Sequence, residues 1–173
     1  MRKLNTYLNE TDPNPCSWKG VTCSNNNRSI TRLTFRCLKL SNSDFLTDSC
    51  AIDTLESLDV SQNSLTSIPD KFITDCGRIN VLYILNFSAN RLSDVLPTFS
   101  GFKGLQYLDL SYNSLSGNIN SQLNGLVGLR SLNLSFNRFN GSVPTKLGKD
   151  MVLKELELAV NSFDGRIPEV LMN

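Results

Sequence analysis

The sequence contains no histidine among its 173 residues, and this absence excludes the commonest forms of nucleophilic catalysis. Without an imidazole, neither a Ser-His-Asp triad nor a Cys-His pair forms, and most zinc sites lose their usual nitrogen ligand. The glycines of residues 99–104 (FSGFKG) match neither G-x-G-x-x-G nor a Walker motif, so they indicate no phosphate-binding loop. Glu155 and Glu157 lie two residues apart, which is more typical of a solvated strand than of an acid–base pair. We therefore expect no enzyme activity, no metal and no cofactor.

Long apolar runs and blocks of like charge are also missing. The chain has 17 basic and 16 acidic residues, a net charge of +1, and no stretch of about 20 apolar residues that would span a membrane. Nucleic acid and anionic membranes are therefore not expected partners. The first residues are polar and show no signal peptide, so we interpret the sequence as a piece of a longer protein or a short gene product.

What the sequence does contain is a repeat. The segment 105–119 (LQYLDLSYNSLSGNI) begins with the pattern LxxLxLxxNxL, and the last three copies follow one another at a step of 24 residues. Copies of this pattern begin at six positions, namely Ile30, Leu55, Leu82, Leu105, Leu129 and Leu153. In the first copy a leucine replaces the asparagine. A period of this length predicts a solenoid of about six repeats.

Each copy of LxL predicts a short strand whose leucines face inward and whose middle residue faces outward. One such unit cannot bury its own apolar face, so the repeats must stack into a parallel sheet with a continuous leucine core behind it. An asparagine follows each strand, and its amide both donates and accepts hydrogen bonds. We expect a ladder in which these asparagines satisfy turn backbone groups of neighbouring repeats: Asn63, Asn90, Asn113, Asn137 and Asn161.

After the shared segment, the repeats continue as LSGxIPxxLxxL, for example at Ser116, Gly117 and Ile119. In this the chain resembles leucine-rich-repeat proteins of the plant extracellular subclass. The resemblance implies an α/β horseshoe with a parallel sheet on the concave face and short 3-10 or irregular segments on the convex face. It also implies an incomplete amino-terminal cysteine cap over residues 1–29 and repeats over residues 30–173, the last one truncated and without a carboxy-terminal cap. The long connection 68–80 is expected to bulge on the convex side.

The five cysteines fall into two groups. The segment 14–23 (NPCSWKGVTC) resembles the amino-terminal cap of that family, which implies a disulfide between Cys16 and Cys23; a metal site there is disfavoured by the spacing. Cys50 and Cys76 lie on equivalent segments of consecutive repeats, whose spacing near 5 Å suits a disulfide. We expect this pair with Cys37 free, and a Cys37–Cys50 pair is the alternative.

Five N-x-S/T sequons accompany these cysteines, at Asn9, Asn27, Asn86, Asn133 and Asn140. Sequons alone are weak evidence, but together with the cysteines they predict a glycoprotein that is secreted to the apoplast or faces outward at the plasma membrane.

The most promising interaction site is the column of residues just before each asparagine. This column becomes apolar toward the carboxy-terminal repeats, at Tyr112, Phe136 and Val160. We take these three, with Tyr107 and Asp109 on the neighbouring strand, as candidate partner-binding residues. The alternative is that the aromatic residues only shield the asparagine ladder.

The family resemblance implies a recognition module of a plant receptor-like kinase or receptor-like protein. Such a module binds a peptide ligand or the ectodomain of a co-receptor, and the membrane is reached only through a segment outside this chain. Whether a kinase domain follows is left open. A secreted inhibitor of cell-wall-degrading enzymes, similar to polygalacturonase inhibitors, is the alternative. The outward columns are too mixed for an ice-binding face.

Overall fold

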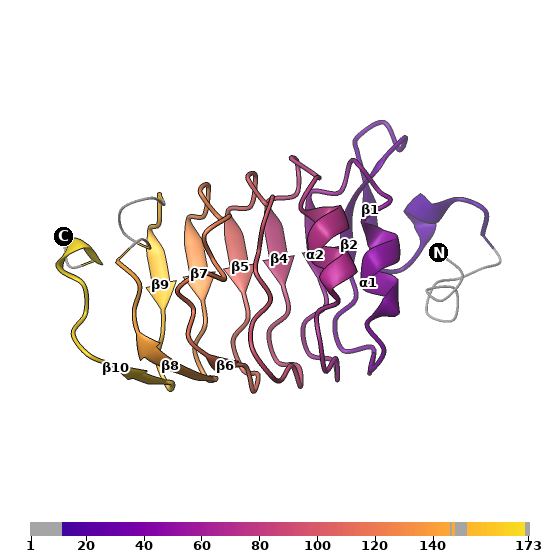
Figure 1. Ribbon diagram of the computed structural model, residues 1–173. Coiled ribbons are helices and arrows are strands. Elements are labelled where there is room, and N and C mark those ends of the chain that lie inside the picture. Colours follow the sequence, from indigo (N-terminus) through magenta and orange to yellow (C-terminus); the bar gives the residue numbers. More distant parts are fainter. Residues whose placement is uncertain (1–11, 146, 148–151, 172–173) are drawn as a thin grey trace.

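The computed structural model describes residues 12–145, 147 and 152–171, which form an elongated solenoid (Figure 1). Its main sheet has seven strands in the order β1-β2-β3-β4-β5-β7-β9. The strands are β1 (Val21–Cys23), β2 (Ile30–Thr34), β3 (Ser57–Asp59), β4 (Ile84–Asn86), β5 (Tyr107–Asp109), β7 (Ser131–Asn133) and β9 (Glu155–Glu157). The six strands from β2 to β9 are parallel and correspond one to one to the six sequence repeats. The predicted leucine-rich-repeat fold is confirmed.

The leucine at the centre of each strand determines the register. Leu33 pairs with Leu58, and this alignment continues through Leu85, Leu108 and Leu132 to the last strand. These five leucines are at most 3% exposed. Burying a leucine side chain contributes roughly 1.5–3 kcal/mol. A shift by one residue would turn the leucines outward, so the core fixes the register.

Outside the main sheet, the first repeats and the later ones differ. The first repeats contain α1 (Asp44–Ser49) and α2 (Asp70–Cys76), whereas toward the carboxy terminus a second parallel sheet runs along the edge where the main strands end (Figure 1). That sheet has the order β10-β8-β6, with β6 at Ser116–Gly117, β8 at Arg138–Ser142 and β10 at Ser162–Asp164. The 3-10 helices are η1 (Pro15–Ser17) and η2 (Glu169–Leu171). The sequence predicted neither the α-helices nor the second sheet.

The long connection over residues 68–80 is not a loose bulge, because most of it forms α2. This helix buries Phe72 completely, with its ring 5.7 Å from that of Phe87 and 6.3 Å from that of Phe102. The extra residues of this repeat therefore fill the core with a large aromatic side chain.

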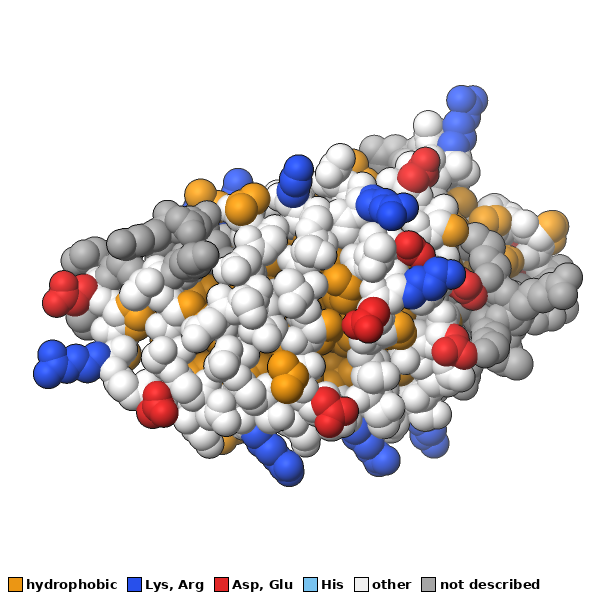
Figure 2. Space-filling view, viewed as in Figure 1, with side chains coloured by type: hydrophobic (Ala, Val, Ile, Leu, Met, Phe, Trp, Pro, Cys, Tyr) orange, Lys and Arg blue, Asp and Glu red, His pale blue; other side chains and the backbone are white. Residues whose placement is uncertain are grey.

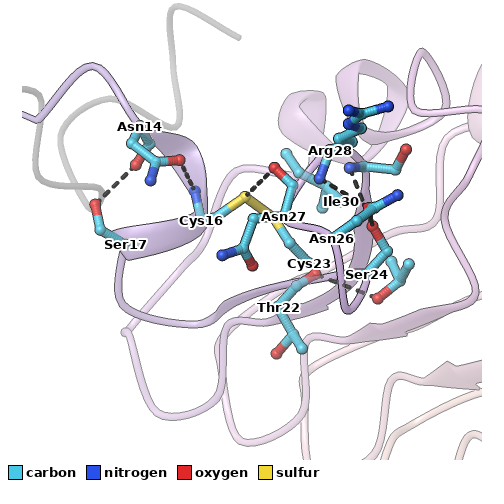
Figure 3. Close-up of a disulfide and its surroundings, with 12 residues drawn as sticks. Asn14, Cys16, Ser17, Thr22, Cys23, Ser24, Asn26, Asn27, Arg28 and Ile30 are labelled. Atoms are coloured by element: carbon cyan, nitrogen blue, oxygen red, sulfur yellow. Dashed lines mark hydrogen bonds between the residues drawn. A yellow bond between two sulfur atoms is a disulfide. The ribbon is translucent and has the colours of Figure 1, made fainter.

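The amino-terminal segment closes the first edge of the sheet. Strand β1 pairs antiparallel with β2, so the outer groups of β2 do not remain open. A disulfide joins Cys16 to Cys23, as the family resemblance implied (Figure 3). Asp12 supports the segment, since its carboxylate accepts hydrogen bonds from the Ser17 hydroxyl and the Asn14 N–H, which together lower the pKa of Asp12. The cap and the repeats share one sheet, and their division at residue 30 stays a prediction.

A second disulfide joins Cys50 to Cys76, with the α-carbons 4.7 Å apart. Cys50 is the C-cap of α1 and Cys76 is the last residue of α2, so the bond ties together the ends of the two helices. Cys37 is free and exposed. The expected pairing is therefore confirmed, and the alternative Cys37–Cys50 pair is not formed.

Candidate recognition surface

The asparagine after each strand lies beneath the candidate surface and bonds to backbone groups of its own and the preceding repeat. The Nδ2 of Asn113 donates to the carbonyl oxygens of Phe87 and Leu110, both at 3.1 Å, and its Oδ1 accepts from the Leu92 N–H at 2.9 Å. Equivalent bonds are made by the other four asparagines of the series, namely Asn63, Asn90, Asn137 and Asn161. The predicted ladder is confirmed, and its role is structural.

A second series of bonds occupies the outward side of the strand ends. The Asp109 Oδ1 accepts from the Ser111 N–H at 2.9 Å and from the Ser111 hydroxyl at 2.7 Å. Asn86 with Ser88, and Asn133 with Ser135, repeat this arrangement. Asp109, one of the candidate partner-binding residues, is thus already engaged in holding a turn.

The column just before the asparagines has a backbone conformation that the sequence did not indicate. All six residues have a left-handed backbone with φ between 52° and 58°, namely Cys37, Gln62, Ala89, Tyr112, Phe136 and Val160. This conformation costs an ordinary residue roughly 1–2 kcal/mol and is an outlier for a β-branched one. It persists because neighbouring repeats hold it: the Tyr112 N–H donates to the Ser135 carbonyl at 3.0 Å, and the Phe136 N–H to the Ala159 carbonyl at 2.9 Å.

The three candidate residues of this column form one exposed patch, which we call the aromatic flank: Tyr112, Phe136 and Val160. The rings of Tyr112 and Phe136 are stacked, with centroids 4.2 Å apart and planes 9° apart. The three side chains are 56%, 40% and 62% exposed, in chain order. The structure therefore brings together three residues that lie 24 residues apart in the sequence.

The remaining candidate, Tyr107, lies on β5 on the same face as Asp109, because alternate residues of a strand share a face. Its side chain is 43% exposed, and it makes no ring contact within the described part of the chain. The five candidates thus divide into the aromatic flank and a separate pair on the strand. Their role in binding stays a prediction.

In the described part of the chain, charge and metal chemistry add no further site. Basic and acidic side chains are interspersed on the face shown in Figure 2, with no broad area of one sign. Within residues 12–145, 147 and 152–171, no group of three or more potential ligands is placed to hold a metal ion. No helix of the same residues is long and apolar enough to cross a membrane.

Four of the five sequons fall in the described ranges. Asn27 and Asn140 are exposed, whereas Asn86 and Asn133 are half-buried at the ends of β4 and β7. Asn9 lies outside the described residues. Glycosylation of these asparagines stays a prediction.

Comparison with known families agrees with this geometry. The leucine-rich-repeat family matches residues 54–76 and 81–139, and the leucine-rich-repeat N-terminal domain matches residues 9–24. The chain is a leucine-rich-repeat protein. Its match to the N-terminal domain includes both Cys16 and Cys23, which form the disulfide of the amino-terminal segment.

Plant receptor kinases and their ectodomains are among the similar proteins. Phytosulfokine receptor 1 of Arabidopsis thaliana is 32% identical over 111 residues, which are 63% of this leucine-rich-repeat chain and 8% of the receptor. The Arabidopsis receptor kinase HAESA was solved with the peptide hormone IDA and the co-receptor SERK1, and it is 30% identical to this chain with a TM-score of 0.86. The match covers 98% of this chain and 30% of the HAESA chain.

The ectodomain of the receptor kinase SOBIR1 from Arabidopsis thaliana matches over nearly the whole of both chains. It covers 95% of this chain, and this chain covers 94% of it, at 27% identity and a TM-score of 0.74. This leucine-rich-repeat chain therefore resembles plant receptor-kinase ectodomains in sequence and in structure. It spans only a small part of the receptors matched by sequence.

Proposed function

We propose that this chain is an extracellular recognition module that binds a peptide or the ectodomain of a co-receptor, without catalysis, through the aromatic flank. The complex of HAESA with a peptide hormone and a co-receptor supports this class of partner, because HAESA has the same fold over 98% of this chain. The two disulfides support an oxidising, extracellular setting. No observation among the described residues favours the alternative of cell-wall enzyme inhibition, and we do not propose it.

The observation that supports the flank is the conformational cost of its residues. Glycine or asparagine would adopt the left-handed backbone at positions 112, 136 and 160 with less strain, yet the chain has Tyr, Phe and Val there. Their side chains remain exposed and do not contribute to the buried core. Bulky residues held in strained, exposed positions are typical of functional surfaces.

The rival interpretation, that the aromatic residues shield the asparagine ladder, is weakened by the earlier repeats. Ala89 and Gln62 occupy the same position with the same backbone, and neither has an aromatic ring. The ladder bonds of Asn63 and Asn90 beside them are nonetheless formed. An aromatic ring is therefore not needed to keep these bonds.

The test is the double variant Tyr112→Ala with Phe136→Ala, probed with peptides selected on the wild-type chain from a displayed library of random linear peptides. Large aromatic side chains in an interface contribute ~2 kcal/mol or more each, so we expect binding to weaken more than tenfold while the far-ultraviolet spectrum is unchanged. Gln62→Ala, at the equivalent position of an earlier repeat, is the matched control and should bind like the wild type. A folded double variant that binds all selected peptides with unchanged affinity would show that the flank is not the binding surface.

A further inference from the structure

The same outward turn is made with aspartate in two repeats and asparagine in two others. Asp109 and Asp59 accept the backbone N–H of the serine two residues later through Oδ1, and so do Asn86 and Asn133. In every case one side-chain oxygen is sufficient, and that oxygen is present in both residue types. The turn therefore does not require the Nδ2 of an asparagine.

The Nδ2 atoms of Asn86 and Asn133 take no part in the turn and are not fully buried. Neither makes a hydrogen bond with the described part of the protein, whose bonds to these side chains all involve Oδ1. Within the described residues, the only fully buried side-chain nitrogen or oxygen without a hydrogen-bond partner is the Ser61 Oγ. The two Nδ2 atoms also lack a partner, so they are not fully buried. Both Nδ2 atoms therefore contact solvent at the outward face of the sheet.

Both asparagines also begin an N-x-S sequence, and the serine of each sequon is the serine of the turn. We propose that Asn86 and Asn133 are attachment sites for N-linked glycans that stand on the concave face of the folded sheet. The donor is an oligosaccharide linked to a lipid diphosphate. The bond from the sugar C1 to the phosphate oxygen breaks, a C1–Nδ2 bond forms, Nδ2 loses one proton and the lipid diphosphate leaves. Transfer takes place before folding, and the remaining amide oxygen still accepts both bonds from serine afterwards.

The two sites lie on β4 and β7, on either side of β5, where Asn86 and Asn133 are both in register with Asp109. Two strand spacings separate them, roughly 10 Å. Glycans there cover the middle of the concave face around Asp109 and leave the aromatic flank accessible, since no residue of the flank is a sequon asparagine. This inference concerns a modification and holds whatever the flank binds.

A rival explanation for the asparagines is charge. In the order Asp59, Asn86, Asp109, Asn133, the amides prevent carboxylates from standing side by side on neighbouring strands. Substituting aspartate for these asparagines would remove the glycan site and add a carboxylate at the same time, so it would not distinguish glycosylation from charge. Removing the serine hydroxyl separates them, because the asparagine and its charge state are kept while the sequon is lost.

The experiment expresses the 173-residue chain behind a secretory leader in a plant host and maps glycans by peptide mass spectrometry. We expect glycans at both Asn86 and Asn133. Ser88→Ala and Ser135→Ala should each remove one glycan, and the turn should survive, as at Asp59, where the serine N–H alone makes the bond. Each loses one hydroxyl bond, so its melting temperature should fall by no more than about 4 °C.

A gain-of-site variant completes the design. Asp109→Asn creates the sequence N-L-S at residues 109–111 within an identical turn, so it should gain one glycan and still fold. Unmodified Asn86 and Asn133 in secreted, folded protein would overturn the proposal, even if Asn27 and Asn140 were occupied. Glycans found there only on molecules that fail to fold would also overturn it.

Discussion

The amino-terminal and carboxy-terminal repeats share one main sheet but differ in the rest of each repeat. Residues 30–81 contain α1, α2, a disulfide between the two helices and the buried ring of Phe72. In residues 82–171 a second sheet, β6, β8 and β10, runs along the edge where the main strands end (Figure 1). The strands of the main sheet nevertheless keep one register throughout.

The glycine after each carboxy-terminal turn explains the second sheet. Gly117, Gly141 and Gly165 have φ between 74° and 80°, which directs the chain along the neighbouring repeat. Asp94, which replaces this glycine one repeat earlier, has φ 66°, and Val95 beside it pairs with Ser116. Aspartate tolerates the left-handed region, so the substitution is accommodated. The comparison shows that the leucines and the asparagine ladder define the solenoid, whereas the rest of each repeat accepts helices or additional strands.

The largest expected effect comes from breaking the ladder, which both regions share. Asn113→Ala leaves the N–H of Leu92 without its partner. It also removes one of the two amide donors from the carbonyl oxygens of Phe87 and Leu110, which keep only Asn90 and Asn137. The free energy of unfolding should therefore fall by about 4 kcal/mol. Urea denaturation measures this loss of stability. Asn124→Ala, at an exposed turn position, is the control and should change stability by less than about 0.5 kcal/mol. Equal effects of both variants would show that the ladder is not what defines the solenoid.

The second effect concerns only the amino-terminal region. Replacing both Cys50 and Cys76 by alanine opens a loop with a sequence separation of 26 residues, which should cost about 3 kcal/mol. Hydrogen exchange should rise in α1 and α2 and stay unchanged in β7. Cys37→Ala, which removes the free thiol, should leave the stability as it is. Equal loosening of β7 would mean that the two regions are not separable.

The third prediction compares strands within the carboxy-terminal region. Leu153, Leu156 and Leu158 are only partly buried, whereas Leu105 and Leu108 are at most 2% exposed. In a polypeptide of these 173 residues, amides of residues 153–158 should therefore exchange faster than those of 105–110, on the order of tenfold or more. Equal protection of the two strands would contradict the link between burial and local stability.

The smallest effect tests the strain of the aromatic flank. Val160→Gly should raise the free energy of unfolding by up to about 1 kcal/mol, because glycine adopts the left-handed backbone without the clash of a β-branched side chain. Val127 is similarly exposed, at 53%, but its φ is not positive. Val127→Gly should therefore destabilise the chain by about 0.5–1 kcal/mol. Thermal unfolding distinguishes the two signs, and a loss of stability in both variants would mean that Val160 is not strained.

Much of the fold and of the candidate site could be predicted from the period of the sequence. Residues at equal places in successive repeats become neighbours, so the leucine core, the asparagine ladder, the Cys50–Cys76 bond and the adjacency of Tyr112 and Phe136 were all predictable. The helices were not, because α1 and α2 have only six and seven residues. Helices this short are marginal alone and form here through the packing of Phe45 and Phe72 into the core.

The sequence by itself thus determined the order of the strands and which side chains lie in one column, since both depend only on counting residues. Only the tertiary structure decided the conformation of those columns. The backbone of Tyr112 is left-handed because the Ser135 carbonyl of the next repeat accepts its N–H, and no local preference of tyrosine favours that state. Likewise, only the folded turn decided that the Asn86 Oδ1 is used and its Nδ2 is free. Such choices depend on hydrogen bonds that exist once the chain has coiled, and residue types alone do not encode them.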